Sequence, residues 1–483
     1  MNDKQLTLTH PNSKYILMSK KTWDVVMRPT RAINKIVLDR ISIIMSCMTV
    51  SSSLLFEGEI NFSRFENALT IVSRDCPWLL CSLNVSGEEV YLSPRKSEEG
   101  ETDYPYPGHM MCEFTQIAEE FNRSAHTADL LPVKVHEKML RADLAMVSVQ
   151  DLPICSWRLI QFNSHFVVSY RLNHAFYDQS SIVYLLTYLS HAYTLSDSPL
   201  TMAKPVFKPR SNIVPPDFPA FASLEEFDSA APKGYTSAPF SGGTFGPPKT
   251  LTLIINKEKV SELRGVSVFK HISSNDIVHA ALLQIVSRFN CAKARAAAGG
   301  DGMEEGIPQQ QEQPCRVLFA RNMRGPLGLG AEIVGDYVRL QCLQVPSVTA
   351  MDLMELSAAS RASLSEDLGD QYVRECKWFL EYKDRRGPAL CGSPDFMTDE
   401  CAAVVTNWSS FPYQDILFDR SAPIELMLSP TPFTSSQALF VVIAWRGQGV
   451  ARDLVVVVNS LHEGVIAATR EYCEDSGLFI VES

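Results

Sequence analysis

Residues 206–249 divide the chain into two parts of similar length. This stretch is rich in proline, glycine and serine, as in KPRSNIVPPDFP and SAPFSGGTFGPPK, and has neither helical nor strand periodicity. Strand-like and helix-like segments alternate on both sides of it. A chain of 483 residues is also too long for one ordinary hydrophobic core. We therefore expect an N-terminal lobe at 1–205 and a C-terminal lobe at 250–483, joined by this crossover linker.

The clearest local pattern in the N-terminal part is a strand pair followed by a helix. The runs SWRLIQF and HFVVSYRL are strand-like, and the two residues at 163–164 between them fit a hairpin connection. The motif RLNHAFYDQSS spans 171–181, and apolar residues then recur at helical spacing over 182–193. Asp178 or either of the following serines can cap this helix. The motif is therefore predicted to lie on a strand-to-helix turn.

The C-terminal part repeats the mixture of strands and helices. LTLIINK is strand-like, SSNDIVHAALLQIVSRF has the spacing of a helix, and RVLFARN, DYVRLQCLQV, ALFVVIAWRG and DLVVVVN are strand-like again. Residues 292–314, AKARAAAGGDGMEEGIPQQQEQP, are polar and of low complexity, which predicts a disordered insertion. Strands mixed with helices in both halves favour an α/β fold in two lobes, each with a mixed sheet.

Composition argues against several classes of partner. The chain has 44 basic and 55 acidic residues and no sustained basic stripe, so nucleic acid is not expected to bind. The N-terminus lacks a secretory signal, and the early run ISIIMSCMTVSSSLLF is too short and polar to span a bilayer. Twelve cysteines are scattered without a CxxC pair and are expected to be buried thiols. We expect a cytoplasmic protein without a membrane partner.

The sequence also lacks the usual signatures of a bound metal or nucleotide cofactor. No HExxH motif or paired Cys-His spacing is present, so we expect no metal site. The run LGLGAEIVG has the wrong glycine spacing for a dinucleotide-binding turn. No tightly bound cofactor is therefore expected.

His174 and Asp178 are the residues of the motif that could carry chemistry. A histidine with an aspartate four residues later is not a specific signal by itself, and both residues could simply shape the turn. However, His174 ends an apolar strand, which could hold its ring at the mouth of a cleft between the lobes. An imidazole can take a proton from a hydroxyl or amine near neutral pH. Because no GxSxG nucleophile motif is present, direct attack of an acceptor on an activated acyl group fits better than a Ser-His-Asp hydrolase.

With this motif the chain resembles the chloramphenicol acetyltransferase-like superfamily, which includes BAHD acyltransferases and the condensation domains of nonribosomal peptide synthetases. HAFYD resembles the HxxxD motif of the superfamily. Further segments resemble it in the expected order along nearly the whole chain: EGEINFSRFENALTIVSRDCPWL, SSNDIVHAAL, RNMRGPLG with VGDYV, TNWSSFPYQDILF and LVVVVNSLHEGVIAATRE. The resemblance implies two lobes of one fold type with an active site in a tunnel between them, and some segments look more like fungal than plant members.

The resemblance also implies roles for particular residues. His174 would be the general base, reached by the acyl donor from one side of the tunnel and by the acceptor from the other. Asp178 would be structural, pairing with an arginine; Arg321 holds the matching place in RNMRGP, and Arg324 is a rival out of register. Thr406 and Trp408 match a segment that lines the reaction centre and helps hold the tetrahedral oxyanion.

Three departures from the family pattern are visible. Asn173 stands where condensation domains carry a first histidine, which favours the BAHD-type branch. Gln179 replaces the glycine that follows the motif, so the turn must avoid a positive φ or adopt it at a cost. LFDRSAP at 417–423 departs from the DFGWG motif, which leaves coenzyme A and a carrier protein both open as the carrier of the acyl group.

The leading hypothesis from the sequence is an acyltransferase that moves an acyl group from acyl-coenzyme A to a hydroxyl or amine of a specialised metabolite. One alternative is a free-standing condensation-like enzyme that takes the acyl group from a carrier protein. The other is a homologue that binds a metabolite without acylating it, because fold and function are separable.

Overall fold

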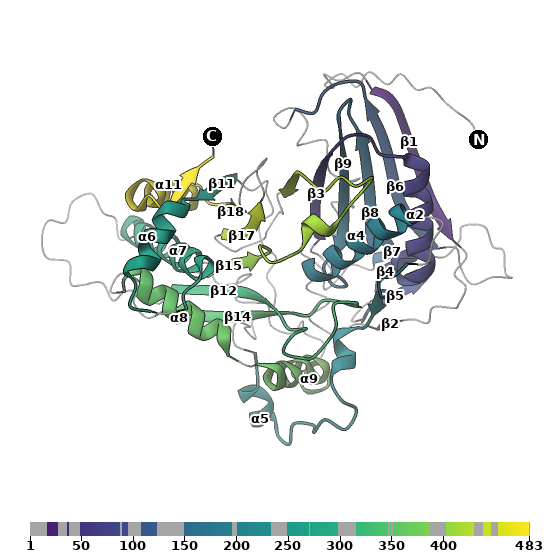
Figure 1. Ribbon diagram of the computed structural model, residues 1–483. Coiled ribbons are helices and arrows are strands. Elements are labelled where there is room, and N and C mark those ends of the chain that lie inside the picture. The colour runs from purple at the N-terminus through teal and green to yellow at the C-terminus, as the bar shows by residue number, and fades with distance from the viewer. Residues whose placement is uncertain are drawn as a thin grey trace, which may run out of the picture.

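The computed structural model describes residues 17–27, 36–37, 49–86, 89–94, 108–122, 149–195, 200–232, 249–269, 271–297, 315–345, 348, 351–366, 368–386, 402–428, 438–445 and 453–482. Two bodies of sheet and helices lie side by side, one containing the first described strand of the chain and the other the last (Figure 1). The expected two-lobed α/β architecture is confirmed.

The first lobe is built on a six-stranded mixed sheet. Its strands run in the order β1 (Leu17–Met27), β6 (Gly108–Ile117), β8 (Cys155–Gln161), β9 (His165–Asn173), β3 (Thr49–Glu57) and β16 (Glu425–Leu428). β8 and β9 are antiparallel neighbours, which confirms the hairpin predicted at 163–164. Apart from the parallel pair β6 and β8, the neighbours in this sheet are antiparallel.

Helices α2 (Phe62–Asp75) and α4 (Gln179–Thr194) cover one face of this sheet (Figure 1). Their apolar residues join strand residues in one large buried cluster, which includes Leu69, Leu186, Phe166 and Tyr170. A smaller sheet beside it has the order β2 (Ile36–Val37), β5 (Glu89–Pro94), β4 (Cys81–Ser86) and β7 (Val149–Pro153), and the short helix η1 (Pro77–Leu80) leads into β4.

The second lobe is built on a seven-stranded sheet. The order is β14 (Val338–Val345), β12 (Cys315–Asn322), β15 (Ala402–Asn407), β17 (Ala438–Trp445), β18 (Asp453–Ser460), β11 (Lys249–Ile255) and β19 (Phe479–Val481). The three strands β12, β15 and β17 are parallel, and the other pairs are antiparallel. Parallel neighbours bring their carboxyl ends to one edge of the sheet, and the segment after β15 lies at that edge.

Four helices pack on one face of this sheet: α6 (Lys257–Val266), α7 (Ser274–Ala297), α8 (Leu353–Ser365) and α11 (Glu463–Ser476). Strand residues such as Phe319 and Val405 belong to the buried cluster under these helices. Their sequence neighbours Leu318 and Val404 point to the other face and belong to the cluster shared with the first lobe. The C-terminal sheet is thus covered by helices on one side and by the first lobe on the other.

The crossover linker contains regular structure. β10 (Val206–Phe207) pairs in parallel with β13 (Ile333–Val334), and η4 (Arg210–Ile213) and α5 (Leu224–Ser229) follow it. α5 lies near α9 (Gly369–Arg386), and their aromatic residues stack, with the rings of Phe227 and Trp378 5.2 Å apart. Residues 233–248 of the linker lie outside the described part of the chain.

Two expected boundaries are corrected. The C-terminal part also supplies β16 to the first sheet, where it pairs with β3, so residues from 250 onward do not form the second lobe alone. The predicted insertion at 292–314 begins too early, because 292–297 continue α7. That stretch reads AKARAA, and alanine, lysine and arginine favour helix. Residues 298–314 lie outside the described part.

The cysteines whose surroundings are described are free thiols, as expected, and most of them are buried. Among the described residues no helix has the length and apolarity to cross a bilayer.

Candidate active site

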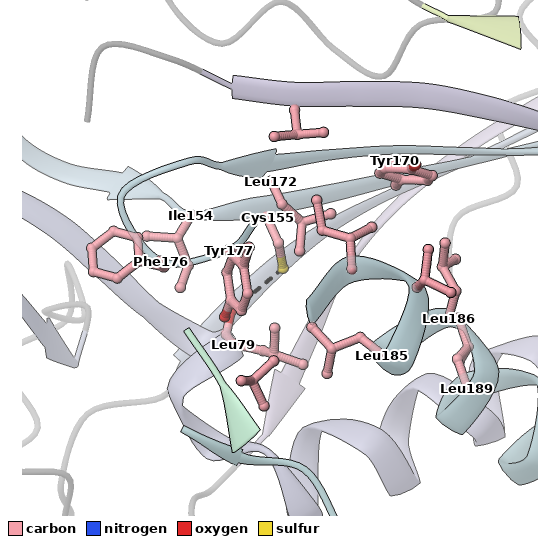
Figure 2. Close-up of a cluster of buried hydrophobic side chains, with 14 of the residues drawn as sticks. Leu79, Ile154, Cys155, Tyr170, Leu172, Phe176, Tyr177, Leu185, Leu186 and Leu189 are labelled. Carbon is pink, nitrogen blue, oxygen red and sulfur yellow. Dashed lines mark hydrogen bonds between the residues drawn. The ribbon is translucent and has the colours of Figure 1, made fainter. Parts of the chain in front are cut away.

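The motif RLNHAFYDQSS forms a turn between β9 and α4. Backbone N–H groups of Phe176 and Tyr177 both donate to the carbonyl of Asn173, at 3.2 Å, and so close the turn. The side chains of these two aromatic residues are fully buried among Leu79, Ile154 and their neighbours (Figure 2). The packing of these two side chains in the core therefore fixes the turn and restricts the movement of the residues on it.

Asp178 fixes the end of this turn. It caps α4, as predicted, by accepting a hydrogen bond from the Ser181 N–H at 2.8 Å. Its other oxygen contacts Arg324 Nη1 at 2.6 Å and the Tyr337 N–H at 2.9 Å. Burial by itself would raise the pKa of Asp178, but the Arg324 charge and these hydrogen bonds outweigh it and hold the pKa below its usual value. The carboxylate thus stays ionised although it is buried.

The arginine that pairs with Asp178 is Arg324, so the assignment of Arg321 was wrong. Arg321 is still within β12 and donates to Gln341 Oε1 at 3.4 Å. Arg324 follows the strand in a turn, where its guanidinium turns back toward the first lobe. A strand residue has its direction set by the pleat, whereas a residue of the following turn does not, and this difference decided the partner.

The Arg324 guanidinium has further partners that fix its position. It donates to the carbonyls of Ile333 at 2.8 Å and Gly335 at 2.9 Å and to the hydroxyl of Ser181 at 2.7 Å. It also lies over the ring of Tyr337, 4.7 Å from the ring centroid. Ser181 in turn donates to the carbonyl of Gly335 at 2.7 Å. The two lobes are therefore joined at the motif by a buried polar network.

His174 faces a second buried ion pair that the sequence did not predict. Its Nδ1 lies 3.9 Å from Asp336 Oδ2, and that oxygen is 3.0 Å from Arg210 Nη2. Nδ1 has no hydrogen-bond partner among the described residues. Burial raises the pKa of Asp336, and the charge of Arg210 opposes this shift. Arg210 comes from the crossover linker; Asp336 comes from VGDYV, a segment that resembles the superfamily but for whose aspartate no role was predicted.

One cavity of about 450 Å³ brings together the residues predicted for the site. It is lined by His174 and Asp178 of the first lobe and by Arg321, Thr406 and Trp408 of the second. The indole N–H of Trp408 donates to Thr406 Oγ1 at 2.9 Å, so these two side chains act as one unit. Further lining residues come from β3, β12, β14, β15, β16, β17, β18, α4, α7, α8 and η4. Both lobes are therefore needed to form the cavity.

The lining of the cavity includes residues from both faces of the C-terminal sheet. Val404 and Leu439 line it from the face of the C-terminal sheet that meets the first lobe. Phe319 and Val405 line it from the face under α7 and α8. The cavity therefore extends from the space between the lobes, around the strand ends, into the layer between sheet and helices. Near the helices the buried Asp276 pairs with Arg361 at 2.6 Å, and the Arg361 side chain is 45% exposed.

Several buried polar atoms of the lining lack a hydrogen-bond partner among the described residues. Besides His174 Nδ1 they are Gln179 Oε1, Asn275 Oδ1 and His279 Nε2. Burial lowers the pKa of His279 to about 4, so its imidazole is neutral at neutral pH. An unpaired buried polar atom is unfavourable, and ligands or ordered waters commonly pair such atoms. No group of three or more potential metal ligands is found in the described part of the chain.

Gln179 follows the motif without backbone strain. It is the first residue of α4, and the described residues with positive φ other than glycine are His271, Asp419 and Arg420. The turn thus avoids the left-handed conformation, which is one of the two outcomes that the sequence left open. Its side chain occupies space that a glycine would leave empty.

Solved structures with the same fold were found. TRI101 of F. graminearum, crystallised with coenzyme A and deoxynivalenol, is 13% identical and has a TM-score of 0.63, with 93% of this chain and 100% of that chain covered. Vinorine synthase is 13% identical with a TM-score of 0.59, covering 93% and 96%. The first condensation domain of the CDA synthetase is 12% identical with a TM-score of 0.56, covering 92% and 96%.

These likenesses establish the fold, which is the one expected from the resemblance to the chloramphenicol acetyltransferase-like superfamily. Comparison with models of protein families gives no match, and comparison with curated proteins gives none either.

Proposed function

We propose that the protein transfers an acyl group from a thioester, most simply acyl-coenzyme A, to a hydroxyl or amine of a small specialised metabolite. The observation that carries this proposal is the shared cavity, which His174 from one lobe lines together with Thr406 and Trp408 from the other. Support comes from the fold, because TRI101 proteins of the same fold were crystallised with coenzyme A together with a small toxin.

In the proposed reaction His174 is the general base. Its Nε2 takes the proton of the acceptor O–H or N–H while that oxygen or nitrogen attacks the thioester carbonyl carbon. The tetrahedral intermediate then collapses, the C–S bond breaks, and the imidazolium returns the proton to the departing thiolate. A carboxylate at Asp336, 3.9 Å from Nδ1, favours the tautomer with its proton on Nδ1 and therefore leaves the Nε2 lone pair free.

Thr406 is the proposed donor to the oxyanion. Its Oγ1 already accepts the Trp408 N–H, so the hydroxyl hydrogen is available to another acceptor. A donor held in place before the reaction stabilises developing negative charge better than mobile water does. Trp408 would thus act through Thr406. Asp178 has no part in proton transfer in this scheme, because its oxygens are occupied by Arg324 and backbone N–H groups.

The region of the cavity near α7 suits the arm that carries a thioester. Asn275 Oδ1 and His279 Nε2 lie one helical turn apart on the same face of α7, and both are unpaired among the described residues. A phosphopantetheine arm contains two amide groups that can meet such atoms. Coenzyme A and a carrier protein both present this arm, so the region supports a thioester donor of either kind.

The experiment that tests the proposal measures free thiol release. The protein is incubated with a panel of acyl-coenzyme A thioesters and candidate acceptors, and the rate is compared with that of His174→Ala. Removal of a general base should lower kcat about 10²- to 10⁴-fold. His191→Ala is the matched control, because His191 lies on α4 outside the cavity lining. Equal turnover of the His174→Ala protein and the wild type excludes His174 as the base.

A second candidate function is condensation with a donor bound to a carrier protein. The likeness to the CDA synthetase condensation domain, with a TM-score of 0.56, favours it. Transfer from an acyl-phosphopantetheinyl carrier protein but not from free acyl-coenzyme A would support this candidate. A homologue that only binds its metabolite would turn over neither donor.

A further inference from the structure

Gln179 presents a buried, unpaired carbonyl oxygen at the edge of the motif. Its side chain is 5% exposed, and its Nε2 donates to the hydroxyls of Tyr170 at 3.1 Å and Tyr413 at 2.7 Å. Its Oε1 has no hydrogen-bond partner among the described residues, and Gln179 lines the cavity. Glycine, the residue of the resembling family at this place, has no such group.

The orientation of this amide follows from its neighbours. Its Nε2 lies within hydrogen-bond distance of the hydroxyl oxygens of both Tyr170 and Tyr413 and donates to each. Burial raises the pKa of both Tyr170 and Tyr413, which keeps the two phenols protonated. The amide N–H₂ group is thus committed to the tyrosines, and Oε1 is the atom left over.

The anchoring also ties Gln179 to both segments of the proposed site. Gln179 is the next residue after Asp178 and is on the same turn-and-helix segment as His174. Tyr413 belongs to the segment that follows Thr406 and Trp408, in the short helix η5 (Tyr413–Asp415). The Gln179 amide therefore bridges the two segments that carry the proposed base and the proposed oxyanion donor. The substrate that His174 must reach directly is the acceptor, whose O–H or N–H it deprotonates.

We propose that Gln179 Oε1 accepts a hydrogen bond from a second donor group of the acceptor, a hydroxyl or N–H near the group that is acylated. The inference rests on the proposed acyl transfer and narrows the acceptor class to diols, polyols and amino alcohols. An acceptor that lacks the second group leaves Oε1 buried and unpaired, whereas one that has it restores the missing bond. A site with a buried carbonyl that hydrogen-bonds to a substrate group rejects analogues without that group more strongly than an apolar pocket rejects analogues of a different size.

The test compares acceptors that differ by one hydroxyl. With acetyl-coenzyme A as donor, kcat/KM is measured for trans-cyclohexane-1,2-diol, trans-2-aminocyclohexanol and cyclohexanol. The wild type should prefer the first two about tenfold, the discrimination that one buried hydrogen bond provides. Gln179→Met, which keeps the length of the side chain but not its carbonyl, should bring the ratio close to one.

A matched control distinguishes loss of the Gln179 carbonyl from weaker positioning of the Gln179 side chain. Tyr170→Phe removes one hydrogen bond from Gln179 but leaves the second, to Tyr413, in place. Its acceptor ratio should therefore stay close to that of the wild type. If Gln179→Met does not fold, the same substitution is made together with Tyr170→Phe and Tyr413→Phe. This triple variant removes the amide and both phenol hydroxyls together, so no tyrosine hydroxyl stays buried without the hydrogen bond that Gln179 donated.

A binding measurement tests this inference independently of the proposed acyl transfer. Equilibrium dialysis of the three compounds against His174→Ala protein compares affinities without turnover, so it remains valid if no acyl transfer is found. About tenfold tighter binding of the diol and its loss with Gln179→Met support the inference. Equal binding and equal turnover of diol and cyclohexanol overturn it. It is also overturned if Gln179→Met changes only the KM for acetyl-coenzyme A.

Discussion

Replacement of Arg324 by methionine should destabilise the protein strongly, whereas the same change at Arg321 should not. Arg324 neutralises Asp178, which is buried on the turn between β9 and α4, and the pair joins the two lobes. Methionine has a similar length and an apolar side chain, so the change removes the charge and the donors with little change in volume. The contrast between the two arginines tests which of them holds the motif.

The expected loss can be estimated from the contacts. Removal of one partner of a buried ion pair costs about 3–5 kcal/mol. Two hydrogen bonds to Asp178 remain, from the Ser181 and Tyr337 N–H groups, so we expect the lower part of that range, about 3 kcal/mol. Arg324, not Arg321, pairs with Asp178, and loss of the 3.4 Å hydrogen bond between Arg321 and Gln341 should cost about 1 kcal/mol or less.

The measurement is urea unfolding at pH 7 of the wild type and both variants, followed by tryptophan fluorescence. Addition of Asp178→Asn to the Arg324→Met protein should restore part of the loss, because the uncompensated charge is then removed. Burial raises the pKa of an unpaired Asp178, so the Arg324→Met protein should also recover part of the loss as the pH falls from 7 to 5.

Equal losses of stability in Arg321→Met and Arg324→Met proteins would contradict the assignment of Arg324 as the arginine that stabilises Asp178. So would a double variant that is less stable than Arg324→Met alone. Either result would mean that the turn is held by its apolar anchors and not by the ion pair.

Two further predictions concern groups that line the cavity. Because burial lowers the pKa of His279 to about 4, against about 6.5 in an unfolded chain, only the unfolded state binds a proton in this window, and stability should fall by about 3 kcal/mol from pH 6.5 to pH 4. His279→Phe should flatten this part of the pH dependence in urea unfolding, and an unchanged slope would contradict the shift. Thr406→Val should lower kcat about 10²-fold, with Thr406→Ser retaining most of the rate, if its hydroxyl meets the oxyanion. Equal rates for the two variants would exclude that role.

Local sequence patterns predicted the elements around the site. Two strand-like runs joined by a two-residue connection predicted β8 and β9, and helical spacing predicted α4. Asp178 was one of three residues predicted as the helix cap, because short polar side chains reach the first free N–H groups of a helix. These features depend on residues a few positions apart, so one sequence contains the information needed to predict them.

The ion-pair partners of the motif residues could not be predicted from local patterns. Asp178 and Arg324 are 146 positions apart, and the sequence offered two arginines within four residues for one carboxylate. No role was predicted for Asp336 or Arg210 from the sequence, and they meet because β13 pairs with β10 beside them. β16 likewise crosses to the first sheet although its sequence lies between strands of the second.

The sequence by itself determined the catalytic candidates His174 and Asp178, the strand-turn-helix unit that carries them, and the two-lobed α/β class. Hydrophobic periodicity and capping are local, and they act before distant segments meet. Tertiary structure decided which arginine supports Asp178, which ion pair faces His174, and that the Gln179 amide is held by tyrosines from two lobes. Those pairings depend on the register and packing of distant segments, because the positions of strand ends and turns decide which side chains come close enough to interact.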